Sequence, residues 1–92
     1  MNDRWLKIGT FNVRGLKNSN KLKDLVNDVT LYDLDICCIQ ETRETTHICK
    51  QIKNNKGEGY FYINLESSNH FHGIGFISKK GLTFSYKYIH DR

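Results

Sequence analysis

Residues 5–41 decide the fold, and they read WLKIGTFNVRGLKNSNKLKDLVNDVTLYDLDICCIQE. Alternation of side chains from Trp5 to Val13 predicts a first strand. Cap-forming residues, Asn18-Ser19-Asn20, are followed by apolar residues three or four apart that predict a helix: Leu22, Leu25, Val26 and Val29. The short apolar run within Asp35–Gln40 is typical of a central strand buried on both faces. A strand, a helix and a strand in this order indicate the α/β class.

The two strands define a candidate site. Two strands joined by a helix through short connections usually run parallel, in a right-handed crossover. Their carboxyl ends then meet at one edge of the sheet, and these ends carry Asn12 and Glu41, with Arg14 and Gln40 beside them. Ligands of α/β sheets tend to bind just beyond the carboxyl ends of the strands. This edge is therefore where we expect a functional site.

The second half of the chain predicts further strands. Thr42–Lys53 has Ile48 and Ile52 one helical turn apart, and we expect a short helix or a helical turn there. A polar loop follows at 53–59. Alternating or apolar segments predict strands at 60–65, 73–78 and 82–89, with an exposed loop at 66–72 and a three-residue turn, Lys79-Lys80-Gly81, before the last strand.

Length and composition bound the class of protein. A chain of 92 residues holds one domain at most. Hydrophobic residues make up 38% of it, enough for a core, which argues against disorder throughout. No run of about 18 apolar residues occurs, and the first residues, Met1-Asn2-Asp3-Arg4-Trp5, lack the pattern of a secretory signal. We expect neither membrane association nor secretion.

The net charge and the cysteines indicate which kind of partner and which cell compartment suit this chain. The formal net charge is +4, which permits an anionic partner such as nucleic acid without requiring one. Three cysteines, Cys37, Cys38 and Cys49, cannot pair evenly, and the first two are adjacent within an apolar run. A reducing, intracellular compartment fits best.

Glu41 and Asn12 are the candidate-site residues with chemistry to offer. A glutamate at the mouth of a buried strand is a hard oxygen ligand that suits Mg²⁺ or Mn²⁺, ions that bind one or two carboxylates together with water and substrate phosphate. Glu41 could instead cap a helix starting near Thr42, or pair with Arg43. Asn12 could hydrogen-bond a phosphate oxygen or a neighbouring carboxylate, or simply end its strand.

Histidines and cysteines have weaker claims to a metal. His70 and His72 have no third ligand nearby in the sequence, which favours a solvent-facing pair. Cys37 and Cys38 point to opposite faces of a strand, so they cannot share a metal and are expected to pack in the core.

Two further groups are expected to be structural. Asp33 and Asp35 precede the second strand, at the edge opposite Glu41, as turn or cap residues. The aromatic residues of 60–62 and 84–88 are expected to pack in the sheet rather than to stack on bases.

Three blocks of the sequence resemble the endonuclease/exonuclease/phosphatase superfamily: IGTFNVRGL at 8–16, LDICCIQETR at 34–43 and HGIGFIS at 72–78. Their order and spacing match too, and the resemblance covers nearly all of the chain. Within the superfamily the chain is most similar to the endonuclease domains of non-LTR (LINE-type) retrotransposons and to the craniofacial development protein 2-like group. The resemblance implies a four-layer α/β/β/α sandwich (DNase I-like), of which this chain would form the incomplete amino-terminal portion.

The resemblance also implies roles for the site residues. Glu41 matches the glutamate that binds Mg²⁺ or Mn²⁺, and Asn12 matches the asparagine that helps to hold the active-site network and the scissile phosphate, which makes both catalytic. Arg14 stands where many members carry Asn or Asp. It is expected either to meet a phosphate or to pair with Asp35 or Glu44. Gln40 is a further candidate for phosphate or nucleic-acid contact.

The later blocks of the family are missing from this sequence. They supply an aspartate and an asparagine in a glycine-aspartate-phenylalanine-asparagine stretch, a tyrosine, and a terminal aspartate-histidine pair. We therefore expect residues 1–92 to be the truncated amino-terminal segment of such a domain. Alone, it is expected to be inactive and to bind metal weakly. Five apolar residues are expected to lack their partners: Ile36, Cys38, Ile39, Phe76 and Tyr86.

The resemblance implies that the partner is a nucleic acid, of which DNA is the expected kind, and a nuclear location if DNA is the substrate. The oligomeric state is left open. The alternative is a small non-catalytic module that binds nucleic acid or another protein, and the +4 charge and the missing catalytic groups support it.

Overall fold

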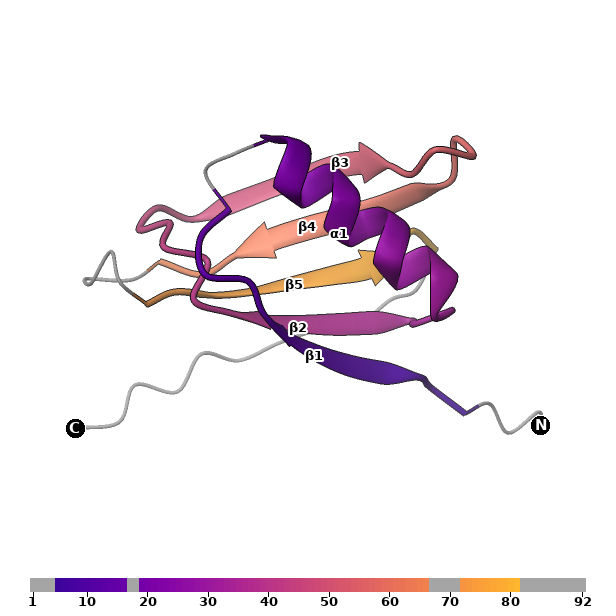
Figure 1. Cartoon of the computed structure of the whole chain (residues 1–92), viewed down its shortest axis with the longest axis horizontal. Helices are drawn as coiled ribbons and strands as arrows, with labels where there is room; N and C mark the ends of the chain where they lie inside the picture. The colour runs from indigo at the N-terminus through magenta and orange to yellow at the C-terminus, as the bar shows by residue number, and fades with distance from the viewer. Residues whose placement is uncertain (1–4, 17–18, 67–71, 82–92) are drawn as a thin grey trace.

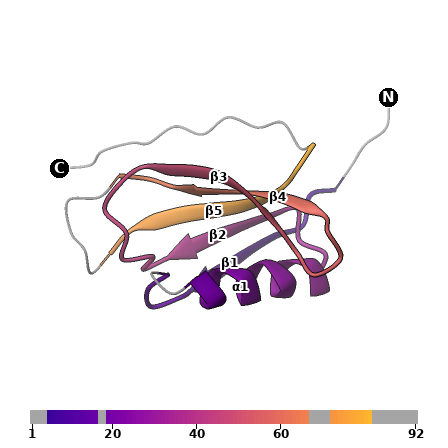
Figure 2. The same ribbon diagram turned by 90° about the horizontal axis from the view of Figure 1, so that it is seen from above.

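One helix packs on one face of a mixed five-stranded sheet in the computed structural model, which describes residues 5–16, 19–66 and 72–81 (Figures 1 and 2). The elements are β1 (Ile8–Asn12), α1 (Ser19–Leu31), β2 (Ile36–Gln40), β3 (Ile48–Lys53), β4 (Gly59–Asn64) and β5 (Ile74–Lys79). The strand order is β1-β2-β5-β4-β3. Strands β1 and β2 are parallel, and the other neighbours are antiparallel. The predicted α/β class and the parallel crossover are confirmed.

Helix α1 supplies one side of the core. Its apolar residues at three- and four-residue spacing, Leu22, Leu25, Val26 and Val29, are all buried, and they cover inward-facing residues of the sheet: Cys37, Ile39, Tyr60, Tyr62 and Ile77. The helix ends because Asp33 takes a left-handed φ of 53°. The Asp33 and Leu34 amides then donate to the Thr30 and Val29 carbonyls, which closes the last turn.

The predicted helix within Thr42–Lys53 is wrong, because Ile48–Lys53 forms strand β3. Ile48 and Ile52 are four residues apart, a spacing that also puts both side chains on one face of a strand. The buried Asn54 favours the strand, because its side chain closes the turn that joins β3 to β4. Its Oδ1 accepts from the Lys56 and Glu58 amides at 3.0 and 2.9 Å.

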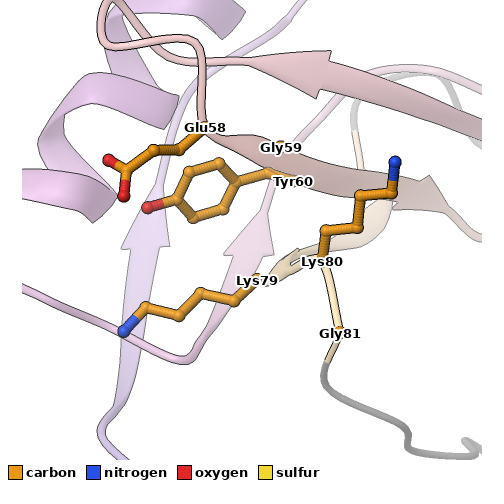
Figure 3. Close-up of a pocket in the computed structure, with 6 residues that line it drawn as sticks. All are labelled: Glu58, Gly59, Tyr60, Lys79, Lys80 and Gly81. Atoms are coloured by element: carbon orange, nitrogen blue, oxygen red, sulfur yellow. The ribbon is translucent and has the colours of Figure 1, made fainter.

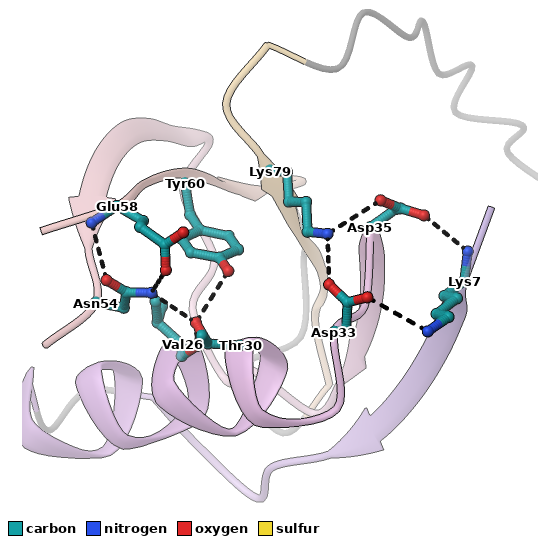
Figure 4. Close-up of polar contacts among 9 residues, drawn as sticks. All are labelled: Lys7, Val26, Thr30, Asp33, Asp35, Asn54, Glu58, Tyr60 and Lys79. Carbon is teal, nitrogen blue, oxygen red and sulfur yellow. Dashed lines mark hydrogen bonds and ion pairs between the residues drawn. The ribbon is translucent and has the colours of Figure 1, made fainter. Parts of the chain in front are cut away.

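The same Asn54 side chain docks this hairpin on the helix. Asn54 Nδ2 donates to Thr30 Oγ1 at 2.8 Å and to Glu58 Oε1 at 2.9 Å (Figure 4). Thr30 Oγ1 also lies 2.9 Å from the Tyr60 hydroxyl, so α1, the hairpin and β4 share one polar cluster.

An ion cluster joins the residues just before β1 and β2 to the end of β5, at the end of the sheet opposite Glu41. Lys79 Nζ lies 2.8 Å from Asp33 Oδ1 and 3.4 Å from Asp35 Oδ1, while Asp35 Oδ2 accepts from the Lys7 amide at 2.9 Å (Figure 4). Hydrogen bonds from Lys79 and then Lys7 lower the pKa of Asp33. Asp33 lies in the turn after α1, as predicted, whereas Asp35 instead binds the Lys7 amide and Lys79. The pairing of Arg14 with Asp35 is wrong, because the length of β2 separates the two ends.

A pocket of about 330 Å³ lies at this same end, lined by Glu58, Gly59, Tyr60, Lys79, Lys80 and Gly81 (Figure 3). Both lysines already have partners, since Lys79 belongs to the ion cluster and Lys80 Nζ donates to Gln51 Oε1 at 3.2 Å. We therefore assign this pocket no ligand.

The face of the sheet opposite α1 is open among the described elements, since none of them crosses it (Figure 2). It carries the half-buried Ile36, Cys38 and Phe76, and Ile74 is 48% exposed. Ile39 was wrongly placed in this group, because it points to the other face and is fully buried beneath α1.

The expected strand at 82–89 and most of the loop at 66–72 lie outside the described residues. Within the described part of the chain, no helix is long and apolar enough to cross a membrane.

Two isoleucines of β5 test which face holds the core. Ile77→Ala should lower the free energy of unfolding by about 2–5 kcal/mol, because Ile77 is fully buried and its truncation leaves a cavity beneath α1. Ile74→Ala, in the same strand, should change it by less than about 0.5 kcal/mol. Urea unfolding of both variants measures the difference, and equal losses would contradict this placement of the core.

Candidate functional site

The site is built where the parallel pairing of β1 and β2 continues past the ends of both strands. Asn12 lies opposite Gln40 in the register. Beyond them, the Val13, Gly15 and Leu16 amides donate to the carbonyls of Gln40, Glu41 and Thr42 at 3.0, 2.6 and 2.9 Å. Segments 13–16 and 40–42 therefore keep the alignment that the strands begin.

A third segment joins from the start of β5. The Thr42 amide donates to the Gly73 carbonyl at 3.3 Å, and the Arg43 amide donates to the His72 carbonyl at 2.7 Å. Backbone hydrogen bonds thus join residues 13–16, 40–43 and 72–73 at this edge of the sheet.

Asn12 and Glu41 meet at this edge, and their predicted adjacency is confirmed. Asn12 Nδ2 donates a hydrogen bond to Glu41 Oε2. Glu41 Oε1 lies 3.9 Å from Arg43 Nη2, with the two side chains 35% and 44% exposed. A pair this long and this exposed is weak, so Oε1 stays open to a stronger cation. Capping of a helix by Glu41 is wrong, because residues 41–47 contain no helix.

Charged side chains of both signs lie at this edge of the sheet. Arg14 is exposed, and its carbonyl accepts from Lys21 Nζ at 3.4 Å. The Arg43 side chain passes close to Gly15, and Gln40 is exposed at the end of β2. A groove of about 190 Å³ between β1 and α1 is lined by Phe11, Asn12, Val13, Lys21, Asp24, Leu25 and Asp28. Sequence reasoning did not identify Lys21, because nothing in the helical pattern marks which exposed residues face the end of β1.

Left-handed backbone is concentrated at the site. Arg14, Glu41 and Arg43 have φ of 51°, 57° and 58°, and Gly15 and Gly73 have φ of 100° and 115°. For residues other than glycine this conformation costs roughly 1–2 kcal/mol each. Such strain persists only where the surroundings impose it, and it gathers at functional sites.

A buried polar cluster lies directly behind Glu41. Thr42 and Asn64 are fully buried, and Thr42 Oγ1 donates to Asn64 Oδ1 at 2.6 Å. Asn64 Nδ2 in turn donates to the carbonyls of Glu44, Thr46 and Leu65 at 3.0, 2.9 and 3.1 Å. The Tyr62 hydroxyl donates to the Glu44 carboxylate, and burial, followed by this carboxylate, raises the pKa of Tyr62.

The donor set suits a hard cation that keeps most of its water. Glu41 contributes one carboxylate, and Mg²⁺ commonly binds through only one or two in proteins. Across residues 5–16, 19–66 and 72–81, no group of three or more His, Cys, Asp or Glu side chains is placed to hold a metal. His72 is exposed, and His70 lies outside the described residues. Glu41 is the residue that would hold a hard cation such as Mg²⁺ or Mn²⁺, which accepts a single carboxylate.

Comparison with curated proteins and with solved structures gives no match. The model of the Endonuclease/Exonuclease/phosphatase family, however, matches residues 9–91, a range that includes Asn12, Glu41 and every described strand except the first residue of β1. The five-stranded sheet with its single helix is consistent with part of a DNase I-like fold. The chain belongs to the endonuclease/exonuclease/phosphatase family.

Proposed function

We propose that this chain forms the amino-terminal, metal-binding part of a divalent-metal-dependent phosphodiesterase domain, of the retroelement DNA endonuclease kind. The hydrogen bond from Asn12 to Glu41 carries the proposal, because it joins an amide and a carboxylate at the sheet edge where ligands of α/β proteins bind. The family match supports the nuclease or phosphatase class.

Each residue of the site has a chemical role in this proposal. Asn12 occupies Oε2 of Glu41, which fixes the carboxylate and leaves Oε1 for Mg²⁺ or Mn²⁺. When bound, the cation would polarise a phosphoryl oxygen and offset developing negative charge. Arg14 and Gln40 are exposed beside this pair and would contact neighbouring phosphates.

DNA is the proposed substrate, with the nucleus as the place of action. Arg43 lies beside Glu41, Lys21 Nζ binds the Arg14 carbonyl and the Arg14 side chain is exposed, and the whole chain has a net charge of +4. Lysine and arginine attract the phosphate backbone of nucleic acids whatever their base sequence.

Glu41→Gln tests the metal role. The wild-type chain should bind Mn²⁺ at about millimolar concentration, as a hard ion held by one carboxylate and mostly hydrated. Paramagnetic broadening in a ¹H–¹⁵N spectrum should then centre on the amides of Asn12 and Glu41. The variant should lose this broadening, because a neutral amide is a poorer ligand.

Glu58→Gln is the matched control, since it removes the same charge at the opposite end of the sheet. Its spectrum should broaden as the wild-type spectrum does. Broadening that survives Glu41→Gln, or that centres on Asp33 and Asp35, would contradict the assignment.

Arg14→Ala tests the phosphate contact. Loss of one phosphate-binding cation should weaken binding to a labelled DNA duplex at every sequence, and should reduce the slope of log affinity against log salt by about one. Lys56→Ala removes the same charge from the exposed hairpin turn at the other end of the molecule and should leave the slope unchanged. Equal effects of the two substitutions would mean that only net charge matters.

Nicking of supercoiled plasmid with Mg²⁺ tests activity. The chain alone should not nick, because the later catalytic residues of the family are missing from its sequence. Robust nicking that Glu41→Gln abolishes would overturn the expected inactivity while supporting the metal role. Salt-dependent DNA binding that is indifferent to Mg²⁺ would favour the alternative, a non-catalytic binding module.

A further inference from the structure

The backbone at Glu41 needs an outside support. Glu41 and Arg43 both adopt left-handed φ, with Thr42 between them, and neither is a glycine or an asparagine that would favour this conformation locally. The turn therefore depends on contacts that its own sequence does not provide. Backbone hydrogen bonds at Glu41 and Arg43 supply part of this support, and the side-chain contacts converge on Thr42.

Thr42 is bonded on every side. It is fully buried; its amide donates to the Gly73 carbonyl, its carbonyl accepts from the Leu16 amide, and its hydroxyl donates to Asn64 Oδ1. The Glu44 amide also approaches the same hydroxyl at 3.4 Å.

Two glycines make room for this contact. Asn64 belongs to β4, and β5 lies between β4 and β2, so the Thr42 side chain must reach across the start of β5. A Cβ at Gly73 would overlap Thr42 Oγ1, and a Cβ at Gly75 would lie 3.4 Å from Thr42 Cγ2 and 2.8 Å from the Ile63 carbonyl. The absence of side chains at both positions lets Thr42 meet Asn64.

Asn64 is itself held rigidly. Its Nδ2 donates to carbonyls at the open end of the β3–β4 hairpin, at Glu44 and Thr46 before β3 and at Leu65 after β4. With Oδ1 taken by Thr42, the amide group has one orientation only. It ties the loop after β2 to the end of the β3–β4 hairpin.

We propose that Asn64, acting through the Thr42 hydroxyl, is a positioning residue that holds Glu41 in its left-handed turn and thereby aims the carboxylate at Asn12. This proposal rests on the proposed function only for the purpose of the positioning, which is to bind a cation. The left-handed turn itself is observed in the chain. Asn64 touches neither the cation nor the substrate in this arrangement.

Thr42→Val and Thr42→Ser form the principal test. Valine keeps the volume of the side chain but removes the hydroxyl. Serine keeps the hydroxyl but removes a methyl group. In Thr42→Val, the amide resonances and the HN–Hα couplings of Glu41 and Arg43 should change, and Mn²⁺ affinity, followed by paramagnetic broadening, should fall about tenfold, as when a group that orients a metal ligand is lost. Thr42→Ser should restore both. Asn64→Asp removes the three hydrogen bonds that Asn64 Nδ2 donates but keeps an oxygen that accepts from Thr42. It should change the Glu41 and Arg43 couplings and the Mn²⁺ affinity in the same way. This variant tests the proposal if Thr42→Val does not fold.

Asn54→Asp is the matched control. Asn54 is also a buried asparagine that organises a loop, but at the other end of the hairpin. The Asn54→Asp substitution should lower the melting temperature without altering the HN–Hα couplings of Glu41 or Mn²⁺ binding. Unchanged Glu41 couplings in both Thr42→Val and Asn64→Asp, or equal changes in Asn54→Asp, would overturn the proposal. If the wild-type chain binds no Mn²⁺, the proposed function fails, while the couplings still decide whether Asn64 holds the turn.

Discussion

Parallel pairing between β1 and β2 is the interaction on which the rest of the site depends. The pairing aligns Asn12 with Gln40, so the residues that follow leave the sheet side by side. Hydrogen bonds from Val13, Gly15 and Leu16 extend the alignment into loops that would otherwise diverge. Because the alignment is made by backbone groups, the side chains of Asn12 and Glu41 remain available to each other and to a ligand.

Two buried asparagines stabilise the two ends of the β3–β4 hairpin in comparable ways. Asn54 satisfies amides of the turn and joins it to Thr30 of the helix, while Asn64 satisfies three carbonyls and joins the hairpin to Thr42. A buried amide without partners would be strongly destabilising. Each asparagine therefore specifies one arrangement of its loop. At the Asn64 end, those hydrogen bonds offset left-handed backbone at Glu41 and Arg43.

Sequence patterns predicted the features that depend on local periodicity. The spacing of Leu22, Leu25, Val26 and Val29 predicted α1, and the crossover rule then predicted that Asn12 and Glu41 would be neighbours. Strand β3 was missed because the spacing of Ile48 and Ile52 fits either a helix or a strand. The decision comes from Asn54, whose bond to Thr30 joins residues 24 positions apart. The contact between Thr42 and Asn64 was missed because it too joins residues far apart in the sequence, 22 positions from each other. Neither residue belongs to a recognisable motif.

The position of β1 at the edge of the sheet has a consequence for the lifetime of the site. Among the described strands β1 pairs only with β2, and most of its residues are exposed. Edge segments with few buried contacts open locally at a smaller free energy than the core, and their amides exchange with solvent sooner. Each such opening would carry Asn12 away from Glu41 while α1 and the central strands stay folded. We therefore expect the fraction of time for which the amide and the carboxylate are in contact to depend on fraying of this one short strand, which overall thermal stability does not report.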